Sequence, residues 1–261
     1  MPKIHVNEID INYEISGQGQ PILFIHGLGS SLRDWELQVP FFSKQYRAVT
    51  FDVRGHGRSD KPRGPYSISQ FAADAAGLIR ALDIAPAHIV GISLGGMIAF
   101  QLAADAPDLV RSLVIVNAAP EFVARTAKER FQVLQRKLIV RLLGMRKMGE
   151  VLGKRLFIKP EQADLRRTFA DRWADNDRRA YRDAMLSILG WSVAHRLGTI
   201  RCPALVIAAD EDYTPVSVKE AYAARMQNAE LAVIRDSRHA TPVEWPQQFN
   251  ETAAEFLSRQ V

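Results

Sequence analysis

A lone serine stands where a buried stretch of the chain gives way to a helix. Residues 90–100 read VGISLGGMIAF, which places Ser93 between Gly91 and Gly95, after a strand pattern and before an apolar helical one. The spacing Gly-x-Ser-x-Gly in this context is typical of a nucleophilic serine, because larger side chains beside it would collide where strand and helix pass closely. The hydroxyl would then lie at a helix N-terminus, where backbone N–H groups favour developing negative charge. A plain turn with a capping serine is the alternative.

A serine hydroxyl becomes a good nucleophile when an imidazole takes its proton, and a carboxylate must then orient that imidazole. Of the six histidines, His239 is the one on a loop after the last predicted strand, which covers residues 229–237. The predicted strand before that one, at 202–209, is followed by three carboxylates in a row, Asp210, Glu211 and Asp212. We predict Asp212 as the partner of His239, because it lies two residues beyond the strand, where a loop can swing its side chain under the histidine. Asp210 is the alternative.

These residues need a framework that brings the ends of separate strands together. Nearly continuous apolar runs indicate strands buried on both faces of a parallel sheet, at 21–27, 46–53, 87–93, 110–118 and 202–209. Helical patterns lie between several of them, including one over 67–83 with Ser67 or Ser69 as N-cap. This alternation predicts right-handed crossovers in an open α/β sheet. Alternating residues at 3–6 and 9–15 predict an opening hairpin.

The rhythm of strands and helices breaks after Pro120. Residues 121–198 contain helical patterns and no convincing strand, and then the strand pattern returns. We therefore predict a single α/β domain with its core at about 1–120 and 199–261, and a helical cap insertion at about 121–198. A separate domain is less favoured, because the chain returns to the same sheet.

Composition excludes several other classes of protein. The chain has 261 residues and a single cysteine, Cys202, so an internal disulfide is excluded. No Cys/His cluster has the spacing of metal ligands. The N-terminus lacks the form of a signal peptide and no apolar run approaches membrane-spanning length. We expect a soluble cytoplasmic protein that needs neither metal nor cofactor; its oligomeric state is not predicted.

The basic charge belongs to one segment. Residues 121–200 carry a net charge of +9, against +5 for the whole chain. No nucleic-acid-binding motif accompanies this charge, so a nucleic-acid partner is not expected. The basic amphipathic stretch around 130–147 is compatible with membrane-surface contact, but packing of that helix onto the sheet is favoured, and no stable membrane insertion is predicted.

Together these motifs resemble the α/β-hydrolase fold superfamily, in particular its serine esterases, lactonases and non-haem haloperoxidases. The resemblance implies an eight-stranded, mostly parallel sheet flanked by helices, with the chain order serine, acid, histidine. It also implies an oxyanion hole formed by the backbone N–H groups of Leu28 and Leu94. His26 is expected to anchor the first of these loops. Ala209 departs from the family, which usually has glycine there, and residues 212–215 look one residue shorter than the common form. The matching stretches are HGLGSSLRDW (26–35), FDVRGHGRSDKP (51–62), VGISLGGMIAFQLA (90–103), LVIAADEDYTP (205–215) and SRHATPVEWP (237–246).

The predicted reaction is hydrolysis of small carboxylic esters through an acyl-enzyme on Ser93. Serine at this turn argues against the epoxide hydrolases and haloalkane dehalogenases of the family, which place aspartate there, and Leu28 makes a perhydrolase less favoured. Lactonases and C–C bond hydrolases with the same triad stay open, as does a small-molecule binding protein on the same scaffold. The cap matches no motif. Trp191 is expected to contact the substrate, and the basic cap suggests that this substrate is anionic.

Overall fold

The computed structural model describes residues 2–260, except 128–129, 132–134, 136–138 and 140–142. Within them, eight strands form one sheet in the order β1-β2-β4-β3-β5-β6-β7-β8. Strand β2 is antiparallel to β1 and β4, and the other neighbours are parallel. The predicted mostly parallel, eight-stranded α/β sheet is confirmed. The strands are β1 (Lys3–Val6), β2 (Ile9–Ser16), β3 (Gln20–Ile25), β4 (Tyr46–Phe51), β5 (Ala87–Ile92), β6 (Val110–Val116), β7 (Ala204–Ala209) and β8 (Ala229–Ile234).

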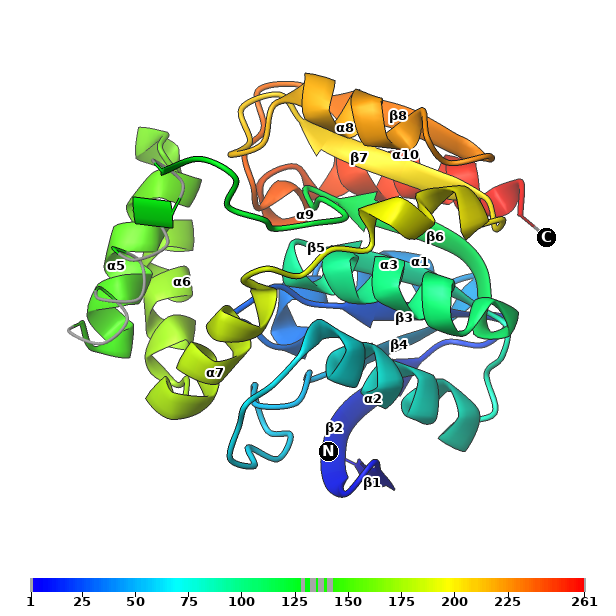
Figure 1. The fold of residues 1–261 in the computed structure, drawn as a ribbon, viewed down its shortest axis with the longest axis horizontal. Coiled ribbons are helices and arrows are strands. Elements are labelled where there is room, and N and C mark those ends of the chain that lie inside the picture. Colours follow the sequence, from blue (N-terminus) through cyan, green and yellow to red (C-terminus); the bar gives the residue numbers. More distant parts are fainter. Residues whose placement is uncertain (1, 128–129, 132–134, 136–138, 140–142, 261) are drawn as a thin grey trace.

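Helices cover both faces of the sheet (Figure 1). Helices α2 (Ile68–Ala81), α3 (Leu94–Asp105) and α8 (Val216–Ala223) share one apolar core with the sheet. Helices α1 (Val39–Phe42) and α10 (Pro246–Ser258) share a second core on the opposite face. Strands β5 and β7 are buried along their whole length, which explains why their sequences read as unbroken apolar runs.

Local sequence explains where these helices begin. Ser67 is the N-cap of α2, because its hydroxyl accepts a hydrogen bond from the Gln70 N–H at 3.0 Å. Helix α3 is apolar nearly all round and lies buried between α2 and the sheet. The short helices α9 (Thr241–Glu244), η1 (Leu32–Trp35), η2 (Pro107–Leu109), η3 (Pro160–Gln162) and η4 (Ala194–Thr199) complete the connections.

Among the described residues between β6 and β7, three α-helices stand beside the carboxyl ends of the strands, on the left of Figure 1: α5 (Met145–Leu156), α6 (Ala163–Ala174) and α7 (Arg178–Ile188). We call residues 121–198 the cap. Its described part has its own small apolar cluster of Met145, Met148, Trp173, Tyr181 and Met185, against which Leu28 packs. Gly144 is extended, so α5 begins at Met145. Most of the predicted helical stretch before it lies outside the described residues.

No helix in the part of the chain that the structure describes is long and apolar enough to cross a membrane.

Candidate active site

Ser93 lies at a strained turn between β5 and α3. Its φ of 54° and ψ of −115° place it outside the regions that residues with a Cβ ordinarily occupy. The turn is held on one side by the Ser93 N–H, which donates to Val116 O at 3.0 Å, and on the other by Met97 N–H, which donates to Ser93 O at 3.1 Å. The half-buried serine therefore stands at the N-terminus of a buried helix, as the sequence pattern predicts.

The flanking glycines make this turn possible. A Cβ at Gly91 would overlap the carbonyl group of Gly95, and a Cβ at Gly95 would overlap the carbonyl group of Ile25 at the end of β3. Strand β3, strand β5 and helix α3 thus approach one another closer than side chains permit. The spacing Gly-x-Ser-x-Gly follows from this steric requirement.

The loop after β3 lies against the serine. A Cβ at Gly27 would be 3.7 Å from the Ser93 Cβ, so this loop and the turn are in van der Waals range. His26 is buried and holds the loop: its Nδ1–H donates to Gly27 O at 2.7 Å, and its Nε2 accepts from the Val53 N–H at 3.0 Å. Both ring nitrogens are occupied by backbone groups. His26 is therefore a structural residue, and the base must be sought elsewhere.

His239 and Asp212 are brought together at the carboxyl edge of the sheet. The His239 Nδ1–H donates to Asp212 Oδ1 at 2.6 Å, and the ring of Tyr213 covers the imidazole at 4.7 Å between ring centroids. The Asp212 side chain is 1% exposed and that of His239 is 20% exposed. A carboxylate on Nδ1 leaves Nε2 as the basic nitrogen, which is the arrangement that a general base needs.

Asp212 stays ionised although it is buried. Burial raises the pKa of its carboxyl, but the hydrogen bond and charge of His239, together with the charge and hydrogen bond of Lys219, outweigh that effect and bring the pKa below its ordinary value. Lys219 Nζ donates to Asp212 Oδ2 at 2.5 Å. The other two carboxylates point elsewhere: Asp210 Oδ1 accepts from the Ser237 N–H at 3.3 Å, and Glu211 pairs with Arg238 at 3.1 Å.

Asn117, which was not among the residues predicted from the sequence, joins the serine turn to the histidine loop. It follows Val116, which binds the Ser93 N–H, and its Nδ2 donates to His239 O at 3.1 Å. Its Oδ1 accepts from the Ala209 N–H at 2.8 Å at the end of β7. One buried side chain thereby connects the ends of β6 and β7 to the loop that carries His239. A single polar residue at the end of the apolar run VIVNAA was the only sign of it in the sequence.

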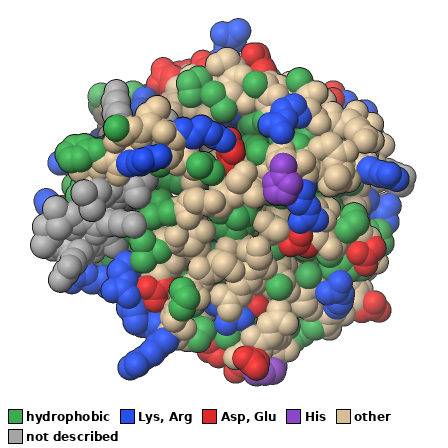
Figure 2. All heavy atoms as spheres, viewed as in Figure 1, with side chains coloured by type: hydrophobic (Ala, Val, Ile, Leu, Met, Phe, Trp, Pro, Cys, Tyr) green, Lys and Arg blue, Asp and Glu red, His purple; other side chains and the backbone are tan. Residues whose placement is uncertain are grey.

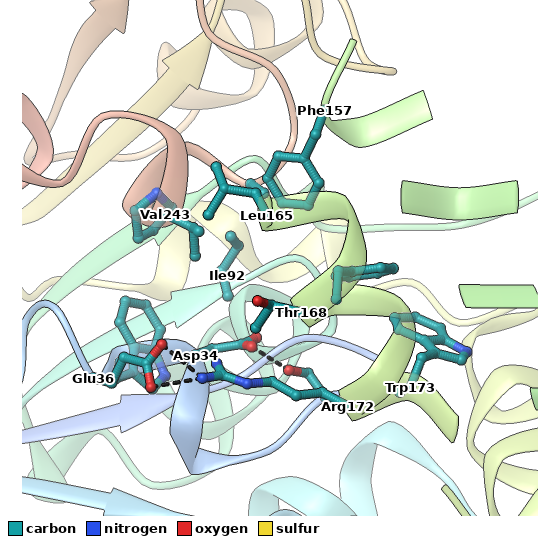
Figure 3. A pocket seen from close by; sticks show the side chains of 15 residues that line it. Asp34, Glu36, Ile92, Phe157, Leu165, Thr168, Arg172, Trp173 and Val243 are labelled. Carbon is teal, nitrogen blue, oxygen red and sulfur yellow. Dashed lines mark hydrogen bonds and ion pairs between the residues drawn. The ribbon is translucent and has the colours of Figure 1, made fainter. Parts of the chain in front are cut away.

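A cavity of about 100 Å³ lies between the core and the cap (Figure 3), and its lining residues do not include Ser93 or His239 themselves. Ile92 and Ala240, next in sequence to Ser93 and His239, contribute to its wall, and Gly29 adjoins the loop of Leu28. Most of the remaining wall is apolar and comes from the cap and α9, with Phe157, Leu165, Phe169, Trp173, Pro242 and Val243. The cavity therefore lies between the core and the cap.

The polar end of this cavity is closed by an ion pair between core and cap. Arg172 Nη2 donates to both carboxylate oxygens of Glu36 at 2.7 Å, as Figure 3 shows. Asp34 lines the same end and accepts a hydrogen bond from the Ser30 hydroxyl. Burial raises the pKa of Asp34, although Ser30, His26 and Arg172 act in the opposite direction. The positive charge of Arg172 is thus already balanced by carboxylates at the cavity wall.

Trp191, which the sequence suggested as a substrate contact, lies away from this cavity. Its indole N–H donates to Gln101 Oε1 at 2.8 Å on the third turn of α3, and Trp191 is absent from the cavity wall. Trp173 occupies the wall, and the substrate contact of Trp191 stays a prediction. Which tryptophan reaches the cavity depends on how the cap docks, and sequence periodicity does not report docking.

The cap also binds the loop that carries His239. Arg238 Nε donates to Arg155 O at 3.0 Å, and Gln162 Nε2 donates to Glu244 Oε1 at 3.2 Å. Glu244 in turn accepts from the Arg238 N–H at 2.8 Å. Residues on both sides of the histidine are therefore held by residues 155–162, which run from the end of α5 to the end of η3.

Lys and Arg side chains spread over the cap side of the molecule with acidic side chains between them (Figure 2). Within the described residues, no group of three or more His, Cys, Asp or Glu side chains is arranged to hold a metal ion.

The architecture and these motifs match known proteins. The model of the alpha/beta hydrolase fold family matches residues 20–244. The chain is 30% identical to a putative carbamate hydrolase, RutD, of Azorhizobium caulinodans, with 98% of both chains covered. It is 27% identical to 3-oxoadipate enol-lactonase 2 of Acinetobacter baylyi, with 99% of both covered. The crystal structure of an enol-lactonase from Burkholderia xenovorans superposes with a TM-score of 0.90 at 28% identity, covering 98% of this chain and 100% of the other. The chain belongs to the alpha/beta hydrolase fold family.

Proposed function

We propose that the protein hydrolyses carboxylic esters of small molecules through an acyl-enzyme on Ser93, with His239 as base and Asp212 as its orienting acid. The observation that carries the proposal is the His239–Asp212 hydrogen bond of 2.6 Å, on a loop that Asn117 ties to the strained serine turn. A serine, an imidazole and a buried carboxylate in this order supply the nucleophile, base and orienting group of acyl transfer.

The reaction would proceed in two halves. The Ser93 Oγ attacks the acyl carbon while His239 Nε2 takes its proton, and the oxyanion accepts hydrogen bonds from the backbone N–H groups of Leu28 and Leu94. The N–H of Leu94 suits this role because it lies in the first turn of α3 and has no acceptor within the helix. The imidazolium then protonates the departing alcohol. Water, activated by the same imidazole, attacks the acyl carbon and releases the acid and Ser93.

The cavity supports a short, uncharged acyl group. Its volume of about 100 Å³ is below the ~150 Å³ of a protein cavity that accepts benzene. Its wall is mostly apolar, and its arginine is paired with Glu36. The net charge of +9 over residues 121–200 supports a second version, in which an anionic substrate is attracted from a distance.

Cleavage of a lactone by the same residues is the alternative that the comparisons favour, since two of the similar proteins are named enol-lactonases. A lactone is an internal ester, so the chemistry at Ser93 would be unchanged and only the shape of the substrate would differ. A C–C bond hydrolase with the same triad, or a small-molecule binding protein on this scaffold, is less well supported.

The test is hydrolysis of a panel of p-nitrophenyl esters, a lactone and a diketone by the wild type and Ser93→Ala. Wild-type turnover with all but a trace lost in a folded Ser93→Ala variant is expected, because only binding and the oxyanion hole remain. Near wild-type turnover by Ser93→Ala would refute the mechanism. A wild type that binds panel members without turning any over would favour the binding protein.

A further inference from the structure

A lysine with no solvent exposure lies directly behind the candidate acid. Lys219 is on α8, and its side chain is 0% exposed. Its Nζ donates to Asp212 Oδ2 at 2.5 Å and to Thr214 O at 2.9 Å. Taking an ammonium group out of water costs several kcal/mol unless a partner compensates, and lysine is almost never fully buried without one. Nothing in the two-step reaction requires a cation here, so its presence calls for a separate explanation.

Each oxygen of the Asp212 carboxylate binds a different partner. Oδ1 accepts from His239 and Oδ2 accepts from Lys219, so the carboxylate is held from both sides. Lys219 is itself anchored on Thr214, in the same short loop as Asp212. The plane of the carboxylate is therefore fixed by contacts that a polar but uncharged side chain would reproduce only in part.

The cation also changes the electrostatics around the imidazole. Protonation of His239 places a second positive charge beside Asp212, whose other oxygen already binds the ammonium group of Lys219. Like charges repel each other most strongly where water is excluded. Tyr222 of α8 is another buried titratable group that Asp212 affects. Its hydroxyl donates to Ala118 O at 3.0 Å, and burial, together with the charge of Asp212, raises its pKa so that it stays neutral. Tyr213 stacks on the histidine. Glu211 and Arg238, which directly precede Asp212 and His239, form an ion pair with each other.

We propose that Lys219 is a positioning residue of this site, which orients Asp212 and keeps His239 unprotonated, and hence basic, at lower pH than an Asp–His pair alone would allow. The inference deepens the proposed function and rests on it. It predicts an effect on the pH dependence of the reaction, which a lysine that merely packs would not have.

The direction of the expected shift in the pH dependence follows from the charges. Removing the cation makes the protonated imidazole easier to form, because Asp212 then has a single positive partner. The acid limb of kcat/KM, below which the base is protonated, should move to higher pH by about one unit in Lys219→Met. Activity at pH 7 should fall about tenfold or more, as the carboxylate loses one of its two fixed contacts. Lys219→Arg, which keeps the charge, should keep the wild-type acid limb. The neighbouring Glu220→Gln, an exposed change on the same helix, is the matched control and should behave as wild type.

The decisive comparison is a double-mutant cycle. If Lys219 acts through Asp212, then Asp212→Asn/Lys219→Met should be within about threefold of Asp212→Asn alone. A further loss well beyond that, or a Lys219→Met variant with a wild-type acid limb, would overturn the proposal. The double variant removes both buried charges, so it also decides the matter if Lys219→Met alone does not fold.

A measurement without substrate separates this inference from the reaction itself. The imidazole of His239 can be titrated by NMR in Ser93→Ala and in Ser93→Ala/Lys219→Met, with its resonance identified by its loss in His239→Asn. A midpoint at higher pH in the variant without the lysine is expected even if the proposed substrate class is wrong. Identical midpoints would refute the role of Lys219, whereas absent ester hydrolysis with shifted midpoints would refute only the proposed function.

Discussion

The carboxyl edge of the sheet and the cap hold their polar residues in opposite ways. At the sheet edge, Asp212, Lys219 and Asn117 are buried and each binds defined partners. Where the cap meets the core, Arg172 and Glu36 form an ion pair with side chains 32% and 51% exposed. Exposed ion pairs contribute about 0–1 kcal/mol each, whereas breaking a buried pair costs about 3–5 kcal/mol. Under the proposed function, the chemistry would depend on buried contacts at the sheet edge, whereas the more exposed contacts of the cap would mainly shape the cavity.

The largest effect that this comparison predicts is at the buried acid. Asp212→Asn should lower kcat on the order of 10⁴-fold, because the imidazole loses the partner that fixes its tautomer. Asp210→Asn is the matched control. Its carboxylate accepts one long hydrogen bond from the Ser237 N–H, so a change of no more than about threefold is expected. Steady-state kinetics on a short p-nitrophenyl ester, with circular dichroism to verify folding, compares the two.

A reversed order, with Asp210→Asn crippled and Asp212→Asn active, would mean that the hydrogen bond to His239 is not the one the reaction uses. The contrast between the sheet edge and the cap would then lose its main support.

The next effect concerns the cap wall of the cavity. Leu165→Ala on α6 should enlarge the cavity and raise kcat/KM for a hexanoate ester relative to an acetate ester by about tenfold, the order that a few methylenes are worth in an apolar pocket. Leu186→Ala, an exposed change on α7, is the control and should leave that ratio unchanged. If Leu165→Ala lowers kcat for every ester alike, this part of the cap contributes to the chemistry and not only to the shape of the cavity.

The smallest effect concerns the charge of the cap. If its net charge of +9 over residues 121–200 attracts substrate, salt should slow an anionic ester more than a neutral one. Raising the salt from 0.01 M to 1 M shortens the Debye length from about 30 Å to about 3 Å, and a relative loss in kcat/KM of roughly threefold or more is expected. Mono-p-nitrophenyl succinate and p-nitrophenyl butyrate make a suitable pair. An identical response of the two would leave the basic residues as an ordinary solvated surface.

Sequence predicted the parts of the site whose local pattern is decisive. The serine turn is recognisable because steric exclusion demands glycine at 91 and 95, and β5 and β7 are recognisable because burial on both faces leaves only apolar residues. The position of Asp212, two residues beyond the strand, distinguishes it from the two adjacent carboxylates, and its Oδ1 lies 2.6 Å from His239 Nδ1 in the structure.

The rest depends on contacts between distant segments. Lys219 stands in SVKEAYAARM, where it reads as one of several polar residues on an amphipathic helix, and only the fold of the loop at 212–215 turns it inward. Trp173 and Trp191 are equally plausible in sequence, because the docking of the cap decides which one meets the cavity. The spacing of apolar residues along a helix shows which face is buried, but not which element that face packs against.

The contacts between the segment at 155–162 and the histidine loop limit how this protein can be altered by exchanging parts. Exchange of residues 121–198 for the corresponding segment of a relative would replace much of the cavity wall. The cap also carries Arg155 and Gln162, which bind Arg238 and Glu244 on either side of His239. A transplanted cap that lacks equivalents of these two contacts would change the cavity and also remove two hydrogen bonds that hold the loop of His239. Recombination at this insertion therefore has to inherit the segment at 155–162 together with the loop at 236–245 as one unit.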